Sequence, residues 1–197
     1  MKKIFLSLTL VTVFVACSAQ AVLDPDPDMV SIYFDTDANV FCVPAPVGPL
    51  TAYLCITNAT SASGILGWEA FVWVTPGINI SAWNLSGSAT NTSTAPDFIV
   101  QLAAALPWQQ SLVVMDFVVD VPNTDTIEFI VYPASTPSIP GHPAYVVGNN
   151  PSEIRSLGYS GGTDPEGNPL VCAIINGDCA PVADADLTWG KVKAMFR

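Results

Sequence analysis

Residues 66–74, LGWEAFVWV, carry the clearest structural signal in this sequence of 197 residues. Two sets of side chains alternate along the stretch: Trp68, Ala70, Val72 and Val74 form one, and Glu69, Phe71 and Trp73 form the other. A period of two is typical of a β-strand, because successive side chains point to opposite faces of a sheet. The same alternation recurs over residues 127–131. Both stretches predict β-strands.

Short apolar runs of this kind recur outward in both directions. β-branched and aromatic residues dominate them and clusters of Pro, Gly, Asn and Ser separate them, which favours strands and turns over helices. The sequence therefore predicts an all-β fold, a single two-sheet β-sandwich of immunoglobulin or jelly-roll type over residues 29–180. The expected strands are Met29–Phe34, Leu50–Thr57, Leu66–Val74, Ile78–Leu85, Asp97–Leu102, Ser111–Val119, Thr126–Tyr132, Ala144–Val147 and Leu170–Ile175.

The composition excludes several classes of protein. Six Lys and Arg stand against 17 Asp and Glu, for a formal net charge of −11; half of the residues are hydrophobic and 17 are proline. A nucleic-acid-binding protein needs many cations to neutralise phosphates, so nucleic acid is not an expected partner. The apolar content argues against disorder, and the prolines argue against long helical bundles.

The first residues predict export. Met1-Lys2-Lys3, the apolar run Ile4–Ala16 and the small residues of Ala19-Gln20-Ala21 predict a signal peptide over residues 1–21. The apolar run is too short for a transmembrane helix, and none is expected elsewhere. An alternative interpretation places a lipoprotein anchor at Cys17. We expect a secreted bacterial protein, extracellular or periplasmic, with an acidic, proline-spaced leader over residues 22–28.

Cleavage after Ala21 would leave most of the positive charge near the C-terminus. The remaining cations are Arg155, Lys191, Lys193 and Arg197. Most carboxylates of the body must therefore be solvated, hydrogen-bonded or neutralised by bound cations.

Residues 181–197 are expected to form a linker and a basic tail. Leu187–Arg197 predicts a short amphipathic helix, with Trp189 on its apolar side and Lys191, Lys193 and Arg197 away from it. One interpretation packs Trp189 on the sandwich. The other makes the tail a tag that export machinery, the cell surface or an acidic neighbour recognises.

Four cysteines follow the signal peptide: Cys42, Cys55, Cys172 and Cys179. An even number in an oxidising compartment predicts two disulfides. Three pairings are open, and we favour Cys42–Cys55 with Cys172–Cys179 because each closes a short loop. A zinc site is the alternative, but the sequence has no CxxC motif and no His companion near these residues.

Several stretches together resemble a recurring group of small exported bacterial proteins whose motifs carry no assigned chemistry. They are Tyr33–Asp37, Cys42, Thr51–Leu54, Gly67-Trp68-Glu69, residues 137–145, Ile175–Asp178 and a terminal Trp189-Gly190-x-x-Lys193-x-x-Phe196-Arg197. Cys172 and Cys179 are additions to that group's pattern. In shape, the predicted sandwich is also similar to cohesin and carbohydrate-binding modules, which implies binding rather than catalysis.

Residues that could support catalysis form no complete set in the sequence. Residues 158–162 match the G-x-S-x-G pattern of a nucleophile elbow, but a turn sequence follows Ser160. The single histidine, His142, fits neither the chain order Ser, Asp, His nor the order His, Asp, Ser. We expect a glycine-rich turn there and a surface or packing role for His142. Glu69 and Asp116 are the acids most expected among aromatic residues, and paired carboxylates are what glycoside hydrolysis needs.

Calcium is the one cofactor for which the sequence offers candidate ligands. Asp35, Asp37 and Asn39 place carboxylate and amide oxygens at alternate positions, as an oxygen-ligand loop does, although the rest of the EF-hand pattern is absent. Asp164-x-Glu166-x-Asn168 and residues 120–125 are further clusters. The alternative is that these Asp and Asn residues only form turns.

Trp83 and Trp108 lie near loops and are the candidate residues for stacking on a sugar ring, whereas most aromatic residues of a sandwich belong to its core. We therefore expect a non-enzymatic binding or structural module of the bacterial cell surface or extracellular matrix, whose partner is a surface component, a glycan or a second copy of the chain. The alternatives are a carbohydrate-binding module, marked by a strip of exposed aromatics, and a secreted glycoside hydrolase, marked by two acids in one cleft.

Overall fold

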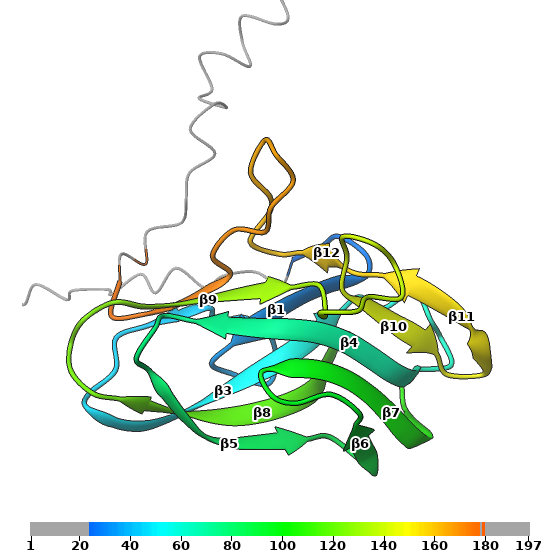
Figure 1. The fold of residues 1–197 in the computed structure, drawn as a ribbon, viewed down its shortest axis with the longest axis horizontal. Coiled ribbons are helices and arrows are strands. Elements are labelled where there is room, and N and C mark those ends of the chain that lie inside the picture. The colour runs from blue at the N-terminus through cyan, green and yellow to red at the C-terminus, as the bar shows by residue number, and fades with distance from the viewer. Residues whose placement is uncertain (1–23, 178, 180–197) are drawn as a thin grey trace, which may run out of the picture.

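A computed structural model describes residues 24–177 and residue 179 (Figure 1). These residues form thirteen β-strands in two sheets and contain no helix. The predicted all-β, two-sheet fold is therefore confirmed. The signal peptide, the start of the leader and the C-terminal helix predicted from the sequence lie outside the described residues. Within them, no helix is long and apolar enough to cross a membrane.

The first sheet has five strands, and its longest neighbours, β3 and β8, pair along their whole length. β1 joins it through β3, and β5 forms its edge beside β8. The order is β12 (Gly158–Tyr159), β1 (Met29–Tyr33), β3 (Gly48–Thr57), β8 (Ser111–Val121) and β5 (Asn79–Leu85).

The second sheet has eight strands built around β4 (Ile65–Val74). One edge of β4 pairs with β7 (Asp97–Leu106), which continues to β6 (Ala89–Asn91). The other strands follow in the order β11 (Asn150–Ser156), β10 (Ala144–Val147), β4, β9 (Ile127–Tyr132), β13 (Ala173–Ile175) and β2 (Cys42–Val43).

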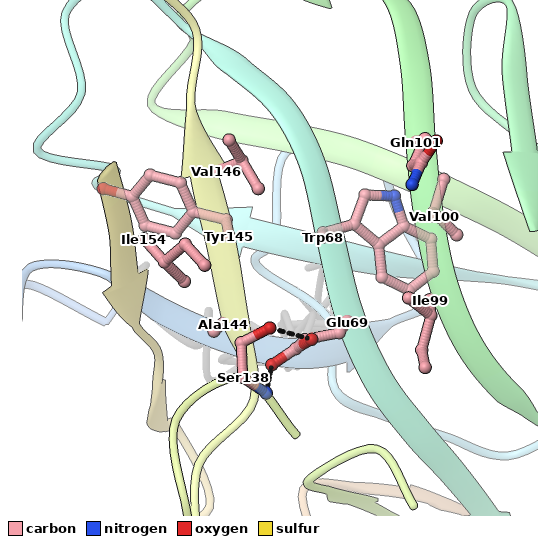
Figure 2. A pocket seen from close by; sticks show the side chains of 10 residues that line it. All are labelled: Trp68, Glu69, Ile99, Val100, Gln101, Ser138, Ala144, Tyr145, Val146 and Ile154. Carbon is pink, nitrogen blue, oxygen red and sulfur yellow. Dashed lines mark hydrogen bonds between the residues drawn. The ribbon is translucent and has the colours of Figure 1, made fainter. Parts of the chain in front are cut away.

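β9 and β10 pair with the same edge of β4 one after the other. Tyr132 of β9 lies opposite Phe71, and Ala144 of β10 lies opposite Glu69. Residues 133–143 therefore leave the sheet and return to it almost where they left, as a loop that interrupts one line of pairing. Figure 2 shows Ser138 of this loop beside Glu69 of β4.

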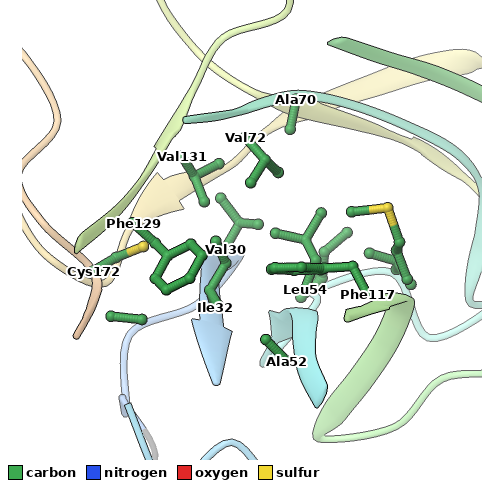
Figure 3. Packing of buried hydrophobic residues seen from close by; sticks show 14 of the residues in the cluster. Val30, Ile32, Ala52, Leu54, Ala70, Val72, Phe117, Phe129, Val131 and Cys172 are labelled. Carbon is green, nitrogen blue, oxygen red and sulfur yellow. The ribbon is translucent and has the colours of Figure 1, made fainter. Parts of the chain in front are cut away.

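Alternation along the strands builds the core between the two sheets. Ala70 and Val72 of β4 point inward with Leu54 of β3, and Phe117 and Phe129 meet from opposite sheets with ring centroids 6.0 Å apart (Figure 3). Burying each such side chain contributes about 1.5–3 kcal/mol to folding. The alternation predicted from residues 66–74 is therefore the alternation that the core uses.

All nine predicted runs contain a strand, and four strands were not predicted: β2, β6, β11 and β12. β11 has the sequence NPSEIRS and is mostly exposed at a sheet edge. Its polar composition carries no strand signal, since an edge strand with one free side needs few apolar residues.

The favoured disulfide pairing is wrong. Cys42 bonds to Cys179, with their Cα atoms 5.5 Å apart, whereas Cys55 and Cys172 are buried free thiols. The physical reason is the topology: Cys42 lies on β2 of the eight-stranded sheet and Cys55 on β3 of the other, while β13 runs parallel to β2 and carries the following residues toward Cys42. In the chain-entropy account, a bond across this separation of 137 residues stabilises the fold by about 5 kcal/mol.

This pairing predicts how the thiols react. In the processed chain, an alkylating reagent should label two cysteines, Cys55 and Cys172, after unfolding without reduction, and four after reduction. In the native protein neither free thiol should react, because both are buried and burial raises the pKa of Cys55 to about 12. Mass spectrometry of the labelled peptides measures this, and finding Cys42 linked to Cys55 would contradict the pairing.

Candidate functional site

The structure separates the two acids considered for glycoside hydrolysis. Glu69 lies on the outer face of the eight-stranded sheet, since its neighbours Trp68 and Ala70 belong to the core. Asp116 lies on the outer face of the other sheet, where Asn84 donates to its carboxylate over 2.7 Å. Two packed sheets stand about 10 Å apart, so the acids on their far sides exceed the spacing of about 5–9.5 Å that hydrolysis needs. They form no catalytic pair.

The G-x-S-x-G stretch begins as the two-residue strand β12, continues as a turn from Ser160, and is not followed by a helix within the described chain. The Ser160 hydroxyl is buried and has no hydrogen-bond partner among the described residues. His142 stacks on Tyr159, with ring centroids 6.3 Å apart. The exposed His142 side chain therefore has the kind of surroundings expected of a surface or packing residue, and it makes no hydrogen bond to Ser160.

The candidate calcium ligands form a turn that the chain itself satisfies. One carboxylate oxygen of Asp35 accepts the backbone N–H groups of Asn39 and Val40 over 2.9 and 2.8 Å. Asp37 is exposed, and no group of three or more His, Cys, Asp or Glu side chains in the described part of the chain converges as metal ligands would. Asp164 likewise caps its own turn through Asn168. A calcium site at Asp35, Asp37 and Asn39 stays a prediction.

The two tryptophans proposed for sugar binding lie in different surroundings. Trp83 packs against the core, with its ring centroid 4.9 Å from that of Phe117 and 5.2 Å from that of Phe98. Trp83 is only partly accessible, because a bulge between Ile80 and Ala82 shifts the alternation of β5 and turns its ring toward the core. Its role in sugar binding stays a prediction. Trp108 is 50% exposed, and its ring N–H donates to the Ala59 carbonyl over 2.7 Å. Trp189, Lys191, Lys193 and Arg197 lie outside the described residues.

The single arginine of the described residues ties the two sheets together. Arg155 of β11 forms an ion pair with Glu153 and donates to the Thr60 hydroxyl over 2.7 Å. Thr60 donates in turn to Asp28, which also accepts the Tyr145 hydroxyl over 2.6 Å. Burial, together with the neighbouring Asp28, raises the pKa of Tyr145. This network joins the start of β1 to β10 and β11, so Arg155 has a structural role.

Two buried carboxylates hold the 133–143 loop against the sheet. Glu69 accepts the backbone N–H and the hydroxyl of Ser138 over 2.6 and 2.9 Å. Asp97, at the start of β7, accepts both groups of Ser135 over 3.0 and 2.6 Å, and the Ser93 hydroxyl over 2.6 Å. Burial raises the pKa of Asp97, but the hydrogen bonds from Ser135 and Ser93 outweigh burial, so that the pKa lies below its usual value.

A depression with a volume of about 160 Å³ opens on the outer face of the eight-stranded sheet, beside this loop (Figure 2). Its walls are aliphatic, formed by Ile99, Val146 and the 40% exposed Ile154, and its polar groups include Glu69 and Gln101. We call it the β4 depression. We did not predict it, because its residues come from four strands and a loop that meet only in the folded chain.

Gly67 helps to keep the β4 depression open. A Cβ atom at this position would lie 2.7 Å from the Val100 carbonyl oxygen and 3.6 Å from the Val146 side chain, so β4 and β7 approach closely only because residue 67 has none. Gly67 and Glu69 belong to one stretch that carried the sequence resemblance, and Ser138 and Ala144 belong to another. Both stretches meet at this depression.

The architecture defines the class of protein as a two-sheet β-sandwich with a shallow site on one outer face. No protein-family model matches the chain, and no curated protein matches it. Three similar solved structures are cohesin domains. The sixth cohesin of scaffoldin B from Acetivibrio cellulolyticus, in complex with a dockerin, is 10% identical with a TM-score of 0.47, and the match covers 77% of this chain and 99% of that chain.

A type II cohesin domain from the cellulosome of the same organism is 15% identical with a TM-score of 0.47, and the match covers 78% of this chain and 97% of that one. The third ScaB cohesin of R. flavefaciens, in complex with a group 1 dockerin, is 11% identical with a TM-score of 0.43, and the match covers 71% and 94% of the two chains.

The Asp97 contacts predict an acid-sensitive contribution to stability. Since folding lowers the pKa of Asp97, the unfolded chain binds the proton more tightly, and the contribution is lost as the pH falls below about 4. Asp97→Asn should lower the free energy of unfolding by about 1–3 kcal/mol at pH 7 and by less at pH 3. Denaturant titrations measure both values. Asp125→Asn, an exposed change of equal charge, is the control, and equal losses at both pH values would contradict the prediction.

Proposed function

We propose that this chain is a non-catalytic binding or structural module of the bacterial cell surface or extracellular matrix. The β4 depression carries the proposal. Its aliphatic walls lie on an outer sheet face, where soluble antiparallel sheets are usually polar, and a few polar groups border it. A site of this shape fits one apolar side chain or ring of a partner. It offers no pair of groups for acid–base chemistry, because Glu69 is held by Ser138.

The Cys42–Cys179 bond supports an extracellular or periplasmic location, since disulfides persist in oxidising compartments. The predicted signal peptide supports the same location. Lipid attachment at Cys17 remains the alternative way in which the exported chain would reach the surface.

If the chain binds its partner through the β4 depression, a charge introduced at the depression should weaken binding, whereas a charge introduced elsewhere should not. Ile154→Glu should weaken binding of the processed chain to isolated bacterial envelopes or extracellular matrix at least about tenfold, because a carboxylate would have to be buried unpaired at the contact. Ile154 lies outward on an edge strand, so the fold should tolerate the change. Co-sedimentation with the envelope and matrix fractions measures the affinity.

Val47→Glu is the matched control, because Val47 is 64% exposed, apolar and distant from the depression in the sheet order. It should leave binding unchanged. Binding that Ile154→Glu leaves intact, or that both changes weaken equally, would contradict the assignment of the depression.

Carbohydrate binding is a second candidate function, and Trp108 is the observation that favours it. Half of its surface is exposed and its ring edge is fixed by the bond to Ala59, so that the indole presents a preoriented face for stacking. On a glycan array, Trp108→Ala should reduce any sugar signal about tenfold or more. Leu170→Ala, at another exposed apolar side chain, should not. An unchanged signal in Trp108→Ala would exclude this residue as the sugar platform.

A further inference from the structure

A second apolar surface lies on the outer face of the eight-stranded sheet, along β4, β9 and β13. We call it the β9 patch. It consists of Phe71, Trp73, Ile130, Tyr132 and Ile174, all of which are partly accessible. The register places Phe71 opposite Tyr132 and Trp73 opposite Ile130, each pair on one face. Their chain neighbours, such as Val72 and Val131, point into the core. A sheet that faces water normally carries polar side chains at such positions.

The five-stranded sheet shows how this chain covers an apolar outer surface elsewhere. Tyr33, Cys55 and Val113 form a cluster outside the main core, and Ala38 and Phe41 from the segment after β1 pack over it. Elsewhere on that face, Asp116 and Asp120 are hydrogen-bonded to side chains of β5. One outer apolar surface therefore has a cover from the same chain.

The segment after Cys179 is tethered within reach of the β9 patch. Cys179 is bonded to Cys42 on β2, and β13 alone separates β2 from β9 in the sheet. Neighbouring strands are about 4.8 Å apart, so the lateral distance from β2 to β9 is about 10 Å. Seven residues, the number from 180 to 186, can span about 23 Å when extended, so the distance from Cys179 to the β9 patch is within reach of a segment that begins at Leu187.

Charge complementarity also favours residues 187–197 as the segment that occupies the β9 patch. Glu128 lies on β9 on the same face as the β9 patch, opposite Ile174. The described residues contain one Lys or Arg, Arg155, and it is already paired with Glu153. Lys191, Lys193 and Arg197 are the other cations that remain after removal of the signal peptide. They flank the apolar residues Trp189, Val192, Met195 and Phe196 in the helix predicted from the sequence.

We propose that Leu187–Arg197 folds back as an amphipathic helix on the β9 patch of its own chain, with its apolar side on Trp73 and Ile130 and a lysine beside Glu128. The tail then covers the β9 patch in the way that residues 38–41 cover the cluster of Tyr33, Cys55 and Val113. A second copy of the chain that donates its tail is the competing occupant, and the experiment distinguishes the two.

Zero-length carbodiimide cross-linking of the complete processed chain tests the contact, because it joins a carboxylate to an amine only when they touch. We expect a link from Glu128 to Lys191 or Lys193. In an equal mixture of unlabelled and ¹⁵N-labelled protein, both linked peptides should carry the same isotope. Mixed-isotope links would assign the contact to a second copy, and the absence of the link would remove the tail from the patch; either result overturns the proposal.

Variants show whether the cross-link reflects the proposed contact rather than a random encounter of a carboxylate with an amine. Glu128→Gln should abolish the link, whereas Asp125→Asn, three residues earlier on an exposed loop, should preserve it. In the tail, Trp189→Ser should lower the melting temperature by about 4–8 °C and increase the binding of a hydrophobic dye, while Trp189→Phe should restore most of both values. Equal melting curves and equal dye binding for the unsubstituted protein, Trp189→Ser and Trp189→Phe would overturn the proposal.

These measurements involve neither Ile154 nor Trp108. If the tail does not contact the β9 patch, the proposal of binding through the β4 depression is unaffected. If binding through the β4 depression is refuted, the proposal for the tail is likewise unaffected.

Discussion

The scarcity of cations is the constraint on which the rest of this structure depends. Between residues 24 and 177 one arginine accompanies fourteen carboxylates. Buried acids must then be satisfied by neutral donors, since an unpaired buried charge would cost several kcal/mol. Glu69 and Asp97 use serine hydroxyls and backbone N–H groups, and Asp28 uses a threonine and a tyrosine. Each of these donors lies far away in the sequence or in a loop, so the carboxylates fix the loops.

The 133–143 loop shows how this constraint shapes the surface. Without the Glu69 and Asp97 contacts, nothing in the strand pairing would specify where the loop rests after leaving β9. With them, Ser138 is placed beside β4 and becomes part of the β4 depression. Glu69 is the one acid among the described residues that line the depression, and its carboxylate already accepts the hydrogen bonds from Ser138. This surface is therefore suited to contact rather than to proton transfer.

A strand could be predicted from the sequence where one of its faces is buried. It could not be predicted where both faces are largely exposed. The alternation at residues 66–74 predicted β4 and its inward side chains, whereas the polar edge strand β11 carried no such pattern. Trp83 was expected to be accessible because it lies near a loop, but a bulge in β5 turns its ring toward the core, and a bulge leaves no mark in composition. The cysteine pairing failed because closeness along the chain was used in place of topology. The β4 depression needs contacts such as Glu69 with Ser138, which only the folded chain creates.

The bond between Cys42 and Cys179 has a consequence for the order of events during biosynthesis. One partner lies near the beginning of the sandwich and the other lies 137 residues later, after the last strand of the described residues. In a chain exported N-terminus first, as the predicted signal peptide implies, Cys42 would emerge well before Cys179, and the native bond could form only after nearly the whole sandwich had emerged. A product truncated before residue 179 lacks the partner of Cys42 and cannot form this disulfide. The bond therefore occurs only in chains that contain all of the described strands.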